Sequence, residues 1–200
     1  MRVVAPGRVN LIGDHTDYTG GLVLPMAIDR YTEITGVVGG DRVRLTSNDE
    51  TEIADLPLNV DRPQDIAPAW AKYVAGVIAE MAAPHGFHGN VSTTIPLGAG
   101  LSSSAALEVA VALALGFQGT ALNLAQLCQR AENRATGLPS GIMDQLAIAT
   151  GLAGHALMID CGELTVTPVA LPPEVEIVVQ FIAPRRLVGS PYADRVSECA

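Results

Sequence analysis

The chain has 200 residues, of which 48% are hydrophobic and only 16% are charged, and its formal net charge is −9. This composition is typical of a globular protein with a large core, and the acidic balance argues against nucleic acid or an anionic membrane surface as a partner. The apolar run ALEVAVALALGF is interrupted by Glu108 and is too short to span a bilayer. Three cysteines at long spacings, without a signal peptide, predict a cytoplasmic protein with reduced thiols.

The first half of the chain predicts strands, a polar loop and one helix. An apolar strand at residues 3–5 is interrupted by a Pro-Gly turn, and the polar loop GDHTDYTGG follows. Residues 31–49 predict a β-hairpin around Gly39 and Gly40, because β-branched residues occupy both arms. Apolar residues at helical spacing then predict a helix from about Trp70 that ends before Pro84.

The second half predicts more helices among short strands. A strand in NVSTTIPLG leads to a central, buried helix over about residues 103–115, and a second helix spans about residues 124–135. A short helix begins near Ser140, which can cap it, and GHALMIDCG and VEIVVQFIA predict two further strands. From Ser190 a new helix begins, so we expect the chain to be a fragment of a longer protein. The mixture indicates an α+β fold.

The stretch PLGAGLSSSAALEVA indicates a phosphate site at the start of the central helix. Backbone N–H groups without bulky side chains, together with serine hydroxyls, gather at the positive end of the helix in Gly98, Ala99, Gly100, Ser102, Ser103 and Ser104. No lysine closes the loop as in a Walker motif, so amides would carry the phosphates, and one hydroxyl can reach a magnesium ion. The alternative is an ordinary helix start whose small residues permit tight packing.

The loop GDHTDY brings Asp14, His15 and Asp17 together, with Arg8 shortly before them. Crowded donors and acceptors suit a polyhydroxylated ligand, because each sugar hydroxyl both donates and accepts hydrogen bonds. Composition alone favours a solvated turn instead. A metal site has thin support, since no further His or Cys lies nearby in the sequence.

Two carboxylates sit in apolar helices. Glu132 lies at the edge of an apolar stripe and needs a cation, for which Arg130 or Arg134 is as good a candidate as a metal ion. Asp144 follows Gly141, which leaves the approach open. It is either an electrostatic helix-start residue or, with an arginine nearby, a general base.

Three stretches resemble known motifs, and the resemblance runs from about Val3 to the end of the chain. APGRVNLIGDHTDYTGGLVLPMAI resembles the galactokinase signature, PLGAGLSSSAALEVA is similar to the phosphate-binding motif of the GHMP small-molecule kinase superfamily, and GLPSGIMDQ is similar to the catalytic segment of that superfamily. The resemblance implies the N-terminal domain of that fold (ribosomal protein S5 domain 2-like), a mixed β-sheet with helices on one side. It assigns residues 1–170 to this sugar- and ATP-binding domain and residues 171–200 to the start of a second domain, whose remainder would follow Ala200.

The same resemblance implies roles for residues. Asp144 would be the candidate base at the galactose C1 hydroxyl, and Arg8 would position that hydroxyl and balance charge. Ser103 and Glu132 would bind Mg²⁺. Sugar contacts would come from Asp14, His15, Asp17, Gly141 and Asp144, and ATP contacts from Trp70, Gly98, Ala99, Gly100, Leu101, Ser102, Ser103 and Ser104.

The function that this resemblance implies is phosphorylation of galactose by ATP to galactose 1-phosphate, by a protein that is a monomer when full length. Asp14 stands where galactokinases usually have Glu, and QFIAPRRL replaces a polar segment of the family, so the sugar stays open. The alternatives are a kinase for N-acetylgalactosamine, arabinose or galacturonate, and a sugar and ATP sensor without turnover. Ser104-Ala105 and Asp144 are both present, which favours the enzyme.

Overall fold

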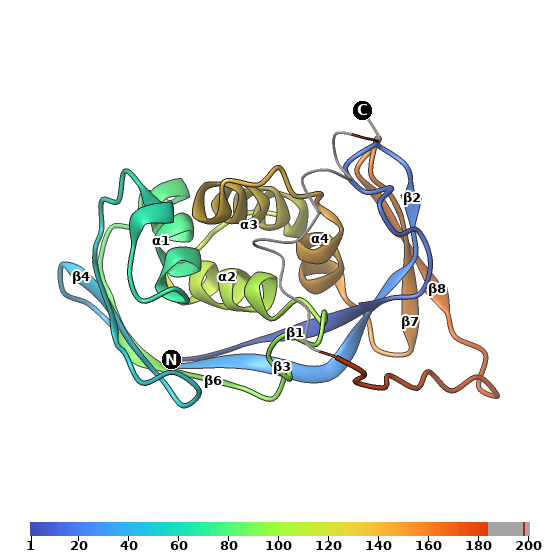
Figure 1. Ribbon diagram of the computed structural model, residues 1–200, viewed down its shortest axis with the longest axis horizontal. Coiled ribbons are helices and arrows are strands. Elements are labelled where there is room, and N and C mark those ends of the chain that lie inside the picture. The colour runs from blue at the N-terminus through green and yellow to red at the C-terminus, as the bar shows by residue number, and fades with distance from the viewer. Residues whose placement is uncertain (184–197, 199–200) are drawn as a thin grey trace.

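The computed structural model describes residues 1–183 and residue 198, and it contains two β-sheets with helices packed against the larger one (Figure 1). The larger sheet has five strands in the order β1-β3-β6-β4-β5, and the smaller has three in the order β2-β7-β8. The bounds of the five strands are Arg2–Asn10 for β1, Pro25–Val38 for β3, Phe87–Thr93 for β6, Arg42–Ser47 for β4 and Ala54–Pro57 for β5. Only β4 and β6 pair in parallel, which confirms the predicted mixed α+β class.

The predicted hairpin over residues 31–49 is wrong, because β6 lies between β3 and β4. Gly39 and Gly40 do reverse the chain, with φ of 141° and 79°. The backbone of this turn is hydrogen-bonded to Gly86 and does not join β3 to β4. Gly39 N–H donates to Gly86 O at 2.9 Å, and Gly86 N–H donates to Gly40 O at 2.8 Å. Gly86 directly precedes β6, so these two hydrogen bonds hold the start of β6 beside the turn between β3 and β4.

Strand β1 continues through Pro6 and Gly7, where the sequence predicted an interruption. Proline lacks a backbone N–H and is tolerated in an edge strand, which has a neighbouring strand on one side only, and β1 is such a strand. The register shifts between Pro6 and Arg8, as in a β-bulge. A side chain at Gly7 would lie 2.8 Å from Leu101 O, so glycine is required where the serine-rich loop crosses the strand.

Four helices cover one face of the larger sheet (Figure 1), as predicted. Their bounds are Ala71–Glu80 for α1, Ser103–Ala114 for α2, Ala121–Thr136 for α3 and Met143–Thr150 for α4, and a short 3₁₀ helix, η1, spans Pro63–Asp65. Nine of the twelve residues of α2 are buried, because α1, α3 and α4 all pack against it. The start of α4 differs from the prediction: Ile142 is its N-cap, and Ser140 bonds Asn133 instead of capping the helix.

The smaller sheet consists of β2 (Leu22–Val23), β7 (His155–Asp160) and β8 (Thr165–Ala170). Strand β7 was predicted, whereas β8 was not. Residues 175–183 are not a strand, contrary to the prediction, and none of the strands within residues 1–183 pairs with them. The helix predicted from Ser190 lies outside the described residues, except for Glu198, which is helical and exposed.

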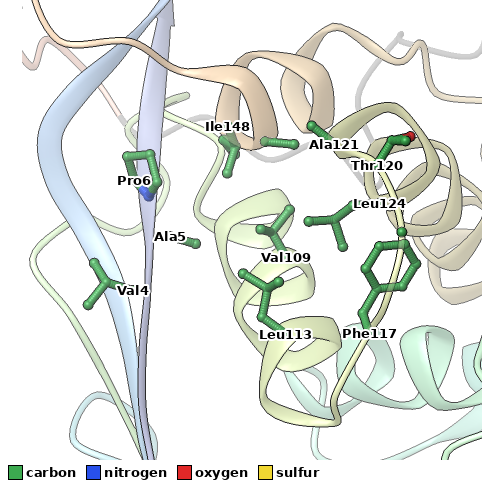
Figure 2. Close-up of a pocket in the computed structure, with 12 residues that line it drawn as sticks. Val4, Ala5, Pro6, Val109, Leu113, Phe117, Thr120, Ala121, Leu124 and Ile148 are labelled. Carbon is green, nitrogen blue, oxygen red and sulfur yellow. The ribbon is translucent and has the colours of Figure 1, made fainter.

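A cavity of about 310 Å³ lies between β1, α2 and the start of α3 (Figure 2). It is lined mainly by apolar side chains, among them Val4, Val109, Leu113 and Phe117. None of the candidate site residues lines it, so the chemistry lies elsewhere. Within residues 1–183 and 198, no helix is both long and apolar enough to cross a membrane.

Candidate active site

Arg8 and Asp144 form the centre of the candidate site. Arg8 follows the register shift in β1, and its Nε lies 2.6 Å and its Nη2 2.5 Å from Oδ1 of Asp144 in the first turn of α4. Its Nη1 donates to Gly100 O at 2.8 Å, and the residue is only 8% exposed. One buried cation therefore joins the strand, the helix and the serine-rich loop, as the general-base alternative for Asp144 required.

The serine-rich loop has a backbone shape that suits an anion. Gly98, Gly100 and Ser102 have φ of 71°, 72° and 59°, so every second residue is left-handed. Alternation of this kind turns successive N–H groups toward one concave surface, directly before the positive end of α2. No side chain caps α2, and Ser102 Oγ instead donates to Asp144 Oδ2 at 2.5 Å. The first amides of the helix are thus left for a ligand.

Glu132 is 5% exposed, and no arginine within residues 1–183 pairs with it. Arg130 and Arg134 both bind Glu80, at 2.7 and 3.2 Å, so neither of these two candidates pairs with Glu132. The Glu132 carboxylate accepts only neutral donors: Ser104 Oγ at 3.0 Å, Gln145 Nε2 at 2.8 Å and Ser140 Oγ at 3.3 Å. Burial first, and the charge of Asp144 second, raise the pKa of Glu132, while these hydrogen bonds lower it.

The residues of the polar loop divide into an inner and an outer set. Asp17 is half-buried, and burial together with the charge of Asp144 raises its pKa, although the backbone N–H of Met143 stabilises its carboxylate. A Cβ at Gly141 would overlap the Asp17 carboxylate, so these two predicted residues are in contact. Asp14 is exposed and accepts a bond from Asn10 Nδ2 at 2.8 Å.

His15 completes the outer set, because it is exposed and its Nδ1 lies 2.9 Å from Tyr18 Oη. Asp17 and Ser140 also line a cavity of about 400 Å³ between the polar loop and α3.

Two predicted residues are not brought into this network. Trp70 is the N-cap of α1, and its indole N–H donates to Glu52 O at 3.1 Å rather than reaching the serine-rich loop. Ser103 is the first residue of α2, but the serine in contact with Glu132 is Ser104. The proposed contacts of Trp70 and Ser103 therefore stay predictions.

The sequence reasoning missed Glu108 and Gln145, which are both 0% exposed. Gln145 Nε2 donates to Glu132 at 2.8 Å and to Glu108 Oε2 at 3.4 Å. Burial first, and Glu132 second, raise the pKa of Glu108 well above its ordinary value. The only signal was a single carboxylate in the apolar run ALEVAVALALGF. In the described part of the chain, the charge of Asp144 acts to raise the pKa values of Asp17, Glu108 and Glu132, and Arg8 pairs with Asp144 itself.

Comparison with known proteins gives the family of the chain. A family model described as the galactokinase galactose-binding signature matches residues 1–36, which hold Arg8 and the polar loop. A second, described as the GHMP kinases N terminal domain, matches residues 50–152, which hold the serine-rich loop, Glu132 and Asp144. The chain belongs to the GHMP kinase family.

Relatives with this GHMP kinase domain cover nearly the whole chain. It is 44% identical to a galactokinase of Roseiflexus sp. (strain RS-1) over 98% of the chain and 52% of the relative, and 45% identical to a galactokinase of Bos taurus over 100% and 55%. The galactokinase of Lactococcus lactis, solved with galactose, matches with a TM-score of 0.82 at 32% identity, covering 98% of this chain and 54% of that one. The chain spans about half the length of the curated relatives it matches.

Proposed function

We propose that this GHMP kinase chain is the sugar- and ATP-binding half of a galactokinase, which transfers the γ-phosphoryl group of ATP to the C1 hydroxyl of galactose to give galactose 1-phosphate and ADP. The observation that carries the proposal is the path of Arg8, which bonds both Asp144 and the carbonyl of Gly100. A sugar site beside Asp144 and a phosphate site at the loop are thereby held next to each other, as transfer between two bound substrates requires.

The sugar would bind at the polar loop and the start of α4. Asp17 and Asp144 face each other across this region, and Gly141 leaves its backbone accessible there. Asp14 and His15, which are exposed at the rim, would bind outer hydroxyls. Because Asp is one methylene shorter than Glu, Asp14 determines a contact that can distinguish galactose from its relatives.

The ATP phosphates would lie on the serine-rich loop, residues 98–104, held by backbone amides and the end of α2. Trp70 is proposed to contact the adenine. A loop without lysine offers no point charge for the β- and γ-phosphates, so cationic charge must come from elsewhere.

The carboxylates present fit a magnesium ion. Glu132 is buried, no cationic side chain in the described part of the chain pairs with it, and serine hydroxyls lie beside it, which is the hard oxygen chemistry that Mg²⁺ prefers. No group of three His, Cys, Asp or Glu side chains suited to a metal occurs among residues 1–183 and 198. Glu132 and Ser103 or Ser104 would hold it. When bound, Mg²⁺ would neutralise charge developing on the transferred phosphoryl group.

Asp144 and Arg8 would act on the hydroxyl. Asp144 accepts the proton of the C1 hydroxyl as the sugar oxygen forms its bond to the γ-phosphorus and the bond to the β-phosphate oxygen breaks. Arg8 holds Asp144 Oδ1 with two N–H groups, and Ser102 holds Oδ2, so the carboxylate has a fixed orientation. Most of the rate would then come from positioning and charge neutralisation.

We further infer that residues 1–170 form one domain, which ends with β8 at Ala170, and that residues 171–200 begin the next. The full-length protein would be a cytoplasmic monomer. Cys128 and Cys161, both buried and free, are consistent with a reducing compartment.

The test is a coupled ADP-release assay with Mg²⁺ and ATP over galactose, N-acetylgalactosamine, arabinose, galacturonate and glucose. It compares this chain with the longest natural protein that contains it. Turnover of galactose by the longer protein supports galactokinase, and preference for another sugar reassigns the substrate. Binding of sugar and ATP by both without turnover supports the sensor.

A further inference from the structure

Gln145 lies at the crossing of three helices. It is the residue after Asp144 in α4, it is 0% exposed, and its amide points between α2 and α3. The Nε2 atom donates one hydrogen bond to Glu132 Oε2 at 2.8 Å and one to Glu108 Oε2 at 3.4 Å. Two carboxylates on one side of the amide determine its orientation, because a flipped amide would present its oxygen to both of them.

Glu108 has no part in the proposed sugar or phosphate contacts. It is the one carboxylate of α2 and is completely buried, and its Oε1 has no hydrogen-bond partner in the described structure. An apolar residue would pack in this helix without the desolvation cost that a carboxyl group carries. Its one hydrogen bond, to Gln145, is therefore the observation that needs an explanation.

We propose that Gln145, backed by Glu108, is a positioning residue that holds the Glu132 carboxylate in the orientation in which it binds a divalent cation. The inference rests on the proposed function. Gln145 holds Glu132 Oε2 while Ser104 holds Oε1 at 3.0 Å, so donors from α4 and α2 determine the plane of the carboxylate. Glu108 takes the second N–H of the amide and prevents its rotation. Groups that orient a metal ligand in this way contribute about 10- to 100-fold to metal affinity.

The primary test is Gln145→Met, which keeps the length of the side chain and removes both donors. Calorimetry measures the affinity of the chain for a non-hydrolysable ATP analogue with and without Mn²⁺. The ratio of these two affinities is the metal-dependent gain. We expect the variant to lose about 10- to 100-fold of this gain, while the affinity for the metal-free analogue stays that of the parent. The electron paramagnetic resonance spectrum of bound Mn²⁺ should change as well.

The control is Gln118→Met. Gln118 follows α2, is exposed, and donates to the backbone oxygen of Gly116 at 3.4 Å, away from Glu132 and Glu108. Its loss should leave the metal-dependent gain unchanged. A purely structural role of Gln145 predicts the opposite pattern, in which thermal stability falls and the gain does not.

A second pair of variants keeps the test decisive if Gln145→Met does not fold. Glu108→Gln retains a polar partner for the Gln145 amide, and Glu108→Met removes it. We expect the metal-dependent gain to survive in Glu108→Gln and to fall in Glu108→Met, in the direction expected for Gln145→Met.

Equal gains in both Glu108 variants and the parent overturn the positioning role, even if the parent phosphorylates galactose. Absence of any metal-dependent gain in the parent, together with absence of turnover by the longer protein, overturns the proposed function and this inference with it.

Discussion

Arg8 contacts both Asp144 and the Gly100 carbonyl, so a single side chain links the proposed sugar site to the proposed phosphate site. The sequence placed Arg8 beside the polar loop, but its contact with Asp144, 136 residues away along the chain, depends on the fold. The polar loop and the serine-rich loop could be singled out from the sequence because their residue types are unusual in apolar surroundings, whereas the roles of their residues stay predictions. The Glu108–Gln145 contact could not, since it depends on how three helices pack.

Asp144→Asn removes the proton acceptor while it preserves the shape of the side chain. We expect kcat for galactose to fall about 10²- to 10⁴-fold in the longest natural protein that contains this chain, with ATP affinity unchanged. The matched control is Asp160→Asn, at the end of β7, where the carboxylate bonds the backbone N–H groups of Gly162 and Glu163. Turnover by Asp144→Asn at the rate of this control would contradict the assignment.

Ser103 and Ser104, at the start of α2, are two alternative candidates for the serine that binds Mg²⁺. Ser104 Oγ bonds Glu132, whereas the family resemblance pointed to Ser103. We expect Ser104→Ala to raise the Mg²⁺ concentration needed for half-maximal turnover more than Ser103→Ala does. Titration of Mg²⁺ at saturating ATP and sugar measures this, and the reverse order of the two variants would restore Ser103 as the ligand.

Gly141→Ala tests the contact between the start of α4 and the polar loop. The added methyl group would overlap the Asp17 carboxylate and push it away. We expect the KM for the sugar to rise while the KM for ATP, measured on the same protein, serves as the internal control. Equal changes in both KM values would indicate general loss of structure.

At the scale of elements, helices could be predicted well and strand partners could not. Spaced apolar residues show which face of a helix is buried, as in α3, and a helix that is apolar nearly all round, such as α2, is buried on most sides. The Gly39-Gly40 turn indicated a chain reversal, but the sequence around it contains nothing about β6, which supplies the actual neighbour of both strands. Residues 175–183 have the composition of a strand and lack a partner.

The burial of Glu108 in α2 makes stability depend on pH. Burial, Glu132 and Asp144 raise its pKa in the folded chain, and the Gln145 hydrogen bond opposes them only in part. As pH rises, the unfolded chain therefore releases the Glu108 proton at a lower pH than the folded chain does. The stability that this proton contributes to the folded chain is fully present below the ordinary carboxyl pKa and is lost as pH rises through the raised pKa.

We expect the unfolding temperature of the parent to fall relative to that of Glu108→Gln as pH rises. Thermal melts of both proteins across that range measure the difference. Tyr73 of α1, whose pKa is raised to about 12 by burial and by Glu132 and Glu108, stays neutral throughout. Parallel curves for the two proteins would contradict the prediction.

At the scale of the whole molecule, an apolar segment projects from the end of the smaller sheet. Within residues 175–182, Val178 is 81% and Ile182 89% exposed, and Phe181 is exposed as well. A contiguous apolar segment of this kind favours association when nothing covers it.

We therefore expect this chain to self-associate, and light scattering after size exclusion should detect it. The double variant Val178→Asp/Ile182→Asp should elute as a monomer. Val37→Asp, at an exposed valine of β3, is the control and should leave association unchanged. Association that persists in the double variant would place the contact elsewhere.

The position of β6 between β3 and β4 also has a consequence for the order of folding. Both neighbours are synthesised before β6, and β4 ends at Ser47 while β6 begins at Phe87. Until the ribosome has added the intervening residues, β3 and β4 each keep an unpaired edge, which is the feature of a nascent chain that invites aggregation. Closing a loop of this length before any parallel pairing forms makes this step slow. The larger sheet would therefore assemble late, because the β1–β3 pair and the β4–β5 pair are joined only when β6 inserts between β3 and β4.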